Sequence, residues 1–128
     1  MKNISPKSAL VSLSDKTNLD LLVSFLLERN VEIISTGGTY KAIKKITDNV
    51  IEVSEYTGHK EMMDGRVKTL HPKIHAGILA RRGEDTDVLK SMGYKEIDIV
   101  VVKLYPFKET LKSGCSFEEA IEQIDIGG

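Results

Sequence analysis

Residues 97–104, IDIVVVKL, place four β-branched side chains in succession, from Ile99 to Val102. A short uninterrupted run of this kind is typical of a strand that is covered on both faces, as in the middle of a parallel sheet. We therefore predict a central strand over 97–104, and this strand decides the fold class.

Three other short segments, 9–13, 31–35 and 50–53, are also rich in aliphatic and β-branched residues. Between the first two, apolar residues recur at helical spacing over 19–27. We predict further helices over 39–46, 85–92, 106–112 and 117–124. Strands that alternate with helices indicate one α/β domain over 1–128, with three layers (α/β/α) around a central, mostly parallel sheet.

The composition limits the function classes. Eighteen Lys and Arg residues against 19 Asp and Glu residues give a net charge of −1, so we expect neither a nucleic acid nor a membrane as partner. The single cysteine, Cys115, has no second cysteine with which to form an internal disulfide. With no long apolar run or signal segment in this sequence, we expect a soluble cytoplasmic protein.

Polar loops follow the first two predicted strands: SLSDKT over 12–17 and STGGT over 35–39. Ligands of open parallel sheets collect at the carboxyl ends of the strands. There, paired glycines let backbone amides approach an anion, and the following helix favours negative charge. The alternatives are a helix cap at Asp15 and a simple glycine turn capped by Thr39.

Residues 65–77, GRVKTLHPKIHAG, form the most unusual stretch, because they combine cations, a hydroxyl and two imidazoles with few large apolar side chains. We interpret the stretch as a functional loop; a solvated basic turn is the alternative. Arg66 offers a planar fork for a phosphate or carboxylate, and Lys68 is a compact proton carrier.

Two histidines four residues apart, His71 and His75, would suit zinc if they shared one helical face. However, Pro72 and Lys73 occupy the positions where a zinc hydrolase motif carries its glutamate. We therefore expect no metal.

Two further candidates lie near the end of the sequence. Tyr105 directly follows the strand, and Pro106 restricts its backbone; a core aromatic is the alternative. Asp125, in IDIGG, would be a carboxylate at the edge of buried structure, although an ordinary turn aspartate would look similar.

Together, SLSDKT, STGGT, GRVKTLHPKIHAGIL, LYPF and IDIGG resemble the amino-terminal IMP cyclohydrolase domain of the bifunctional AICAR transformylase/IMP cyclohydrolases of purine biosynthesis. The likeness runs from about Ala9 to Gly128. It implies a methylglyoxal-synthase-like fold and ring closure of 5-formamidoimidazole-4-carboxamide ribonucleotide to IMP with loss of water. It also implies no cofactor, a homodimer and a transformylase domain in the full-length protein.

The resemblance also assigns roles to residues. It implies that Lys68 and Tyr105 stabilise and protonate the formyl oxygen, and that Asp125 orients the carboxamide or helps to remove its proton. The implied nucleotide contacts are Ser12, Ser14, Asp15, Lys16, Ser35, Thr36, Gly37, Gly38, Arg66, Val67, Thr69, Lys103, Ile126 and Gly127.

The sequence departs from the family pattern at two points. Lys103 stands where the family usually has asparagine, so it either adds a cation beside the ligand or points to solvent. The sequence ends at Gly128, before a family segment with a lysine important for activity, so we expect turnover to need a longer chain.

Two alternatives come from the same fold. Methylglyoxal synthase is disfavoured because this sequence lacks that family's carboxylate-rich histidine loop. A non-catalytic effector-binding domain, as in carbamoyl phosphate synthetase regulation, would need the phosphate loops but not Lys68, Tyr105 and Asp125 together.

Overall fold

The computed structural model describes residues 5–60, 69–103 and 116 of the 128-residue chain. The described elements follow one another in the order β1 (Ser8–Leu13), α1 (Leu19–Glu28), β2 (Glu32–Ser35), α2 (Gly37–Lys44), β3 (Val50–Glu52), α3 (Val53–Thr57), α4 (Pro72–Leu79), α5 (Thr86–Met92) and β4 (Ile99–Lys103). The alternation of strands and helices predicted from the sequence is confirmed over this part of the chain.

The four described strands form one parallel sheet in the order β3-β2-β1-β4. β1 is one of the two interior strands, since it pairs with β2 on one side and with β4 on the other. Along the chain, β2 and then β3 are added on one side of β1, and β4 is added on the other side. The strand order therefore reverses at β1, and such a reversal is where ligands of open α/β sheets bind.

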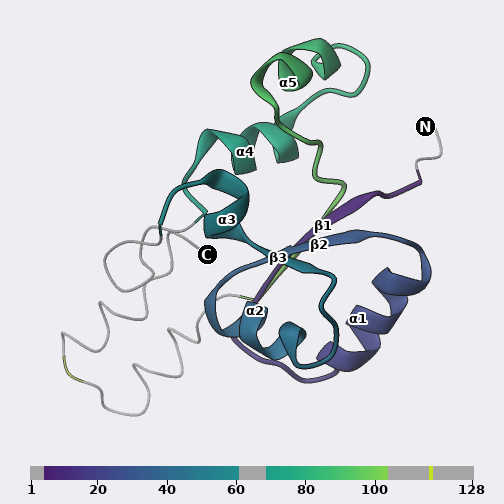
Figure 1. Cartoon of the computed structure of the whole chain (residues 1–128), viewed down its shortest axis with the longest axis vertical. Helices are drawn as coiled ribbons and strands as arrows, with labels where there is room; N and C mark the ends of the chain where they lie inside the picture. The colour runs from purple at the N-terminus through teal and green to yellow at the C-terminus, as the bar shows by residue number, and fades with distance from the viewer. Residues whose placement is uncertain (1–4, 61–68, 104–115, 117–128) are drawn as a thin grey trace.

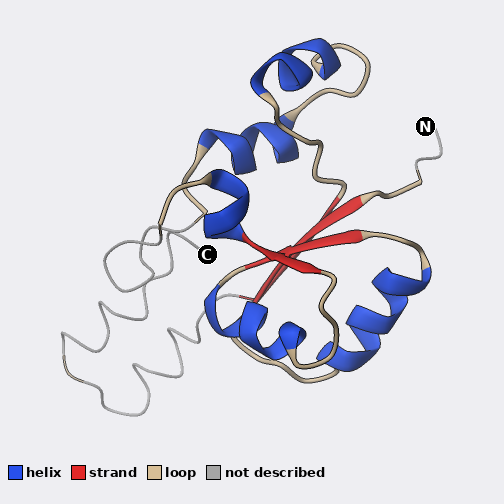
Figure 2. Ribbon diagram, in the orientation of Figure 1, coloured by secondary structure: helices blue, strands red, loops and turns tan. Residues whose placement is uncertain are grey.

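Helices cover both faces of the sheet, as Figures 1 and 2 show: α1 and α2 lie on one face, and α3 and α4 lie on the other. The side chains of successive strand residues point to opposite faces of the sheet. In β1, Ala9 and Val11 join the core beneath α1 and α2, whereas Leu10 joins the core of Ile74 and Ile97 on the other face. The predicted three-layer α/β/α fold is confirmed.

The prediction that 97–104 forms a central strand buried on both faces is wrong in one respect. β4 is an edge strand of the described sheet, and Val100 and Val102 are 44% and 40% exposed. Only Ile99 and Val101 pack against the core under α1. A run of β-branched residues fits a strand with either one or two covered faces, and so the sequence does not distinguish the two.

Two described helices were not predicted. α3 begins directly after β3, and α4 occupies the second half of the stretch 65–77, so the interpretation of that stretch as a loop is wrong from Pro72 onward. α4 is short and only two of its residues, Ile74 and Gly77, are buried, which leaves little apolar periodicity to detect. The helices predicted at 106–112 and 117–124, and Cys115, lie outside the described residues.

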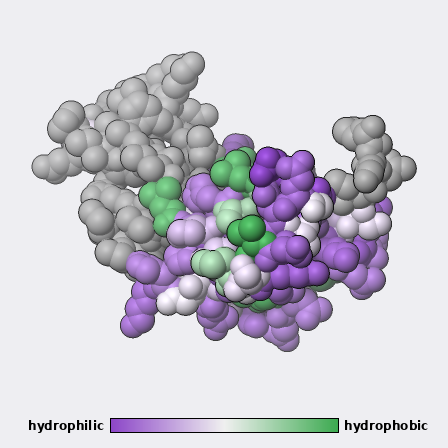
Figure 3. Space-filling model, turned by 90° about the horizontal axis from the view of Figure 1, so that it is seen from above, coloured by the Kyte–Doolittle hydropathy of each residue, from purple (hydrophilic) through white to green (hydrophobic). Residues whose placement is uncertain are grey.

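The face of the molecule shown in Figure 3 is mostly hydrophilic, and its hydrophobic residues lie in small separate groups. On α4 and α5, several apolar side chains are exposed, among them Leu79 at 74% and Val88 at 61%. Among the described residues, no helix combines the length and apolarity needed to cross a membrane.

The packing of α4 on the chain before β4 requires a glycine. The carbonyl of Gly77 accepts a hydrogen bond of 2.9 Å from the amide of Ile97. A Cβ atom at position 77 would lie 2.6 Å from the carbonyl oxygen of Lys95 and 3.0 Å from Cγ1 of Ile97. A backbone oxygen so close leaves no room for a methyl group.

We predict that Gly77→Ala lowers the free energy of unfolding by about 1–3 kcal/mol, because overpacking displaces α4 from the sheet. Urea denaturation measures the change. Gly38→Ala in α2 is the matched control, since a Cβ there meets only the flexible end of Lys16, at 3.8 Å. Helix propensity alone predicts a gain of up to about 1 kcal/mol for each variant; a stabilised Gly77→Ala would contradict the packing argument.

Candidate anion-binding site

The carboxyl ends of β1 and β2 are joined by buried hydroxyl groups at what we call the carboxyl edge of the sheet. Oγ of Ser35 donates to the carbonyl of Val11 at 2.7 Å. Oγ1 of Thr39 accepts from the amide of Leu13 at 2.9 Å and donates to its carbonyl at 3.0 Å. These bonds fix the loop after β1 against the start of α2.

A third contact joins Ser12 to Thr36, whose hydroxyl oxygens lie 3.0 Å apart. Both side chains are buried. The N-cap of α2 is Thr36, not Thr39 as the capped-turn alternative proposed, and the Thr36 side chain makes no cap hydrogen bond. The backbone amides at the start of α2 therefore do not donate to the Thr36 side chain. They lie at the positive end of the helix dipole.

Lys16 brings a cation to the same place. Its Nζ donates to the carbonyl of Leu13 at 2.5 Å and lies 3.8 Å from the position that a Cβ on Gly38 would occupy. The two polar loops predicted from the sequence therefore meet, with the ammonium beside the first turn of α2. Gly37 has a φ of +41°, a left-handed conformation that favours glycine.

Asp15 is not the cap of α1; the N-cap is Asn18. Oδ1 of Asp15 instead accepts from the amide and the hydroxyl of Thr17, at 2.9 and 2.6 Å, and Oδ2 accepts from Nζ of Lys103 at 2.9 Å. The hydrogen bonds from Thr17, and then the one from Lys103, hold the pKa of the Asp15 carboxyl well below its usual range. The carboxylate therefore remains ionised throughout the neutral range.

Lys103 pairs with a neighbouring carboxylate at the carboxyl edge, and its contact with a ligand stays a prediction. Its ammonium is paired with Asp15, and its side chain remains 60% exposed. Its carbonyl also accepts from the amide of Ser14 at 3.0 Å, which extends the pairing of β1 with β4 by one residue.

The described residues of the stretch 65–77, which are 69–77, serve mainly to start α4. Thr69 is buried, and its carbonyl accepts from the amide of His71 at 2.8 Å. His71 is the N-cap: its Nδ1 accepts from the amide of Lys73 at 3.0 Å, and Pro72 fills the first turn. Nζ of Lys73 donates to the carbonyl of Tyr56 at 2.7 Å and lies 4.3 Å from the centre of the Tyr56 ring.

His71 and His75 do not lie on one face of a helix, as a zinc site would require, because His71 precedes α4 and His75 lies within it. Over 5–60, 69–103 and 116, no three His, Cys, Asp or Glu side chains gather in a way that would hold a metal ion.

Several candidate residues lie outside the described part of the chain, so their roles stay predictions. These are the three implied catalytic residues, Lys68, Tyr105 and Asp125, and the implied contacts Arg66, Val67, Ile126 and Gly127. Among the described candidates, the structure brings together Asp15 with Lys103, Lys16 with Gly38, and Ser12 with Thr36.

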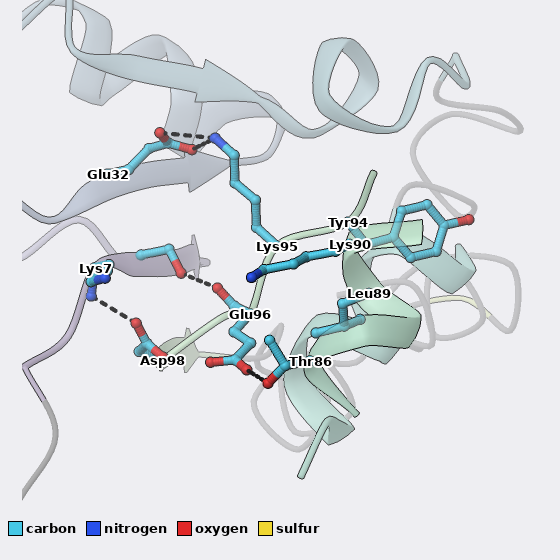
Figure 4. A pocket seen from close by; sticks show the side chains of 10 residues that line it. Lys7, Glu32, Thr86, Leu89, Lys90, Tyr94, Lys95, Glu96 and Asp98 are labelled. Carbon is cyan, nitrogen blue, oxygen red and sulfur yellow. Dashed lines mark hydrogen bonds and ion pairs between the residues drawn. The ribbon is translucent and has the colours of Figure 1, made fainter. Parts of the chain in front are cut away.

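Sequence reasoning missed an open pocket of about 550 Å³ at the opposite, amino edge of the sheet (Figure 4). Its carboxylates are paired with cations: Glu32 with Lys95 at 2.9 Å, and both Glu96 and Asp98 with Arg82. Glu32 and Lys95 are 63 positions apart, and such a distant pair leaves no local sequence signal.

Comparison with known proteins identifies related domains. Residues 19–128 match the model of the family described as MGS-like domain. A solved structure described as "Crystal structure of ForH" is 31% identical, with a TM-score of 0.75; the match covers 96% of this chain and 64% of the ForH chain. β1 precedes the segment matched by the family model, yet it is one of the two interior strands of the described sheet.

The pairing of Asp15 leads to a prediction about how the stability of the fold depends on pH. Because the pKa of Asp15 is lower in the folded than in the unfolded chain, its carboxylate favours folding above about pH 4, and this contribution is lost as the pH falls toward the folded pKa. We expect an NMR titration of the Asp15 carboxyl carbon to give a pKa below the usual value for aspartate. Lys103→Met should raise this pKa. Lys44→Met, which breaks the pair with Asp48, is the control and should leave it unchanged.

The His71 cap of α4 leads to a separate prediction about stability. His71→Ala removes the acceptor for the amide of Lys73 and should lower the free energy of unfolding by about 1 kcal/mol, as for other N-caps. His71→Asn retains a short acceptor and should recover most of the loss. Thermal or urea denaturation of both variants is the measurement, and equal stability of the alanine variant and the original chain would exclude a capping role.

Proposed function

Because the chain belongs to the MGS-like domain family, we propose that it binds a ribose monophosphate at the carboxyl edge of its sheet and closes the ring of 5-formamidoimidazole-4-carboxamide ribonucleotide to form IMP. One observation supports the phosphate-binding part of the proposal: the ammonium of Lys16 lies beside Gly38, at the start of α2. A fixed cation and a helix amino terminus in one place favour a phosphate group. The ring closure is proposed from the resemblance of the sequence.

The buried hydroxyls support binding indirectly. Ser35 and Thr39 hold the loop after β1 against the start of α2 through bonds to Val11 and Leu13. Hydrogen bonds within the protein hold these groups in one position, so less conformational entropy is lost on binding. We propose that they shape the site, while Lys16 and the backbone amides of α2 contact the phosphate.

The chemistry needs donors and an acceptor close together. The carboxamide nitrogen attacks the formyl carbon to form the new C–N bond, the formyl oxygen gains negative charge and then protons, and it leaves as water. Following the resemblance, Lys68 and Tyr105 would stabilise and protonate that oxygen, and Asp125 would orient the carboxamide or take its proton. One well-placed donor is typically worth about 3–4 kcal/mol of the barrier.

The net reaction is an internal dehydration without change of oxidation state, so it requires no redox cofactor, and we propose that it proceeds without a metal. Both reacting groups belong to one molecule, so correct placement supplies much of the acceleration. From the resemblance alone we also propose a cytoplasmic homodimer and a transformylase domain in the full-length protein.

A ring-closure assay tests the activity. We predict conversion of the formamido ribonucleotide to IMP by a chain continued past Gly128, with weaker or no turnover by residues 1–128 alone. Lys68→Ala and Tyr105→Phe should each lower kcat by about 100-fold or more, the effect of removing one donor, while IMP binding persists.

Lys44→Asn serves as the control, since Lys44 lies near the far end of α2 and pairs only with Asp48 among the described residues. Undiminished rates in both test variants would overturn the catalytic roles. Binding of IMP without turnover in the longer chain would indicate a non-catalytic effector domain instead.

A further inference from the structure

We propose that Lys103 sets the anion affinity of the carboxyl edge by neutralising Asp15, so that a phosphate can bind beside Lys16. The inference rests on the proposed function only in requiring a ligand that carries a phosphate. It gives Lys103 a positioning role: the side chain acts through Asp15 and need not touch the ligand.

The sequence places a carboxylate next to the cation of the candidate site, and its negative charge would oppose an anion bound there. Asp15 directly precedes Lys16, whose ammonium marks the candidate site. Both oxygens of the carboxylate accept hydrogen bonds, Oδ1 from Thr17 and Oδ2 from Lys103. Thr17 contributes no charge, so Lys103 is the cation that balances Asp15 in this contact.

The side-chain and backbone contributions of Lys103 are separable. Its carbonyl holds the amide of Ser14 at 3.0 Å, and this bond does not depend on the side chain. Replacing Lys103 by asparagine, the residue usual in the resembling family, therefore removes the charge while the loop remains attached to β4. A change in affinity would then report electrostatics rather than loss of the loop.

The partial exposure of Lys103 and Asp15 determines how strongly the loss of one charge should change the affinity for phosphate. The side chains of Lys103 and Asp15 are 60% and 45% exposed, so water and salt screen their fields. At separations of several ångströms in such surroundings, one unit of charge changes binding by roughly threefold to tenfold. The effect should shrink as ionic strength rises, which a purely structural role would not produce.

Isothermal titration with inorganic phosphate and with IMP, at low and high salt, tests the proposal. We expect Lys103→Asn to weaken the binding of both by about threefold to tenfold at low salt and by less at high salt. Lys103→Arg keeps the cation and should bind like the original chain. The double variant Asp15→Asn, Lys103→Asn removes both charges and should regain most of the lost affinity.

Lys44→Asn is the matched control, because it also removes one lysine from an exposed Lys–Asp pair, here 3.4 Å long, away from the site. It should change affinity by less than about twofold. Circular dichroism and thermal denaturation check that each variant is folded.

The outcomes separate this inference from the proposed function. Unchanged phosphate affinity in Lys103→Asn, or no recovery in the double variant, overturns the role of Lys103 and leaves ring closure untouched. Phosphate binding with the expected pattern but no binding of IMP supports the role of Lys103 and contradicts the proposed function. Failure of the original chain to bind either ligand contradicts both.

Discussion

The parallel pairing of β1 with β2 on one side and β4 on the other is the constraint on which the described structure depends. Parallel strands end at one edge of a sheet, so this pairing brings loops together from both sides of β1. Leu13 meets Thr39 across the β2 side, and Asp15 meets Lys103 across the β4 side. Neither contact is local in sequence, and each requires the register of the sheet.

Polar groups at this edge divide into two sets. The hydroxyls of Ser35 and Thr39 are buried and bonded to the backbone of β1, so they give the edge its shape. Lys16, Asp15 and Lys103 are exposed and charged, so they give the edge its electrostatic character. A rigid, hydrogen-bonded base beneath a small group of exposed charges suits an anion that must be held in one orientation.

The sequence predicted the parts of the structure that depend on local pattern. The strands follow β-branched segments, α1 follows a clear apolar stripe, and the loops after β1 and β2 carry the polar motifs. Prediction failed where a long-range partner is involved: the sequence is compatible with a helix cap at Asp15, but the cap is Asn18 and Asp15 pairs with Lys103, 88 positions away. α4 was missed because its first turn depends on the His71 cap and on close contact at Gly77 rather than on periodicity.

NMR mapping of the backbone amides during titration with IMP tests most directly whether the converging loops form the ligand site. We predict saturable shifts, with one dissociation constant, for the amides of Asp15, Lys16, Gly37 and Gly38. Saturable shifts confined to the amino-edge pocket around Ser8, Thr86 and Lys95, with none at the two glycines, would contradict an anion site at the carboxyl edge.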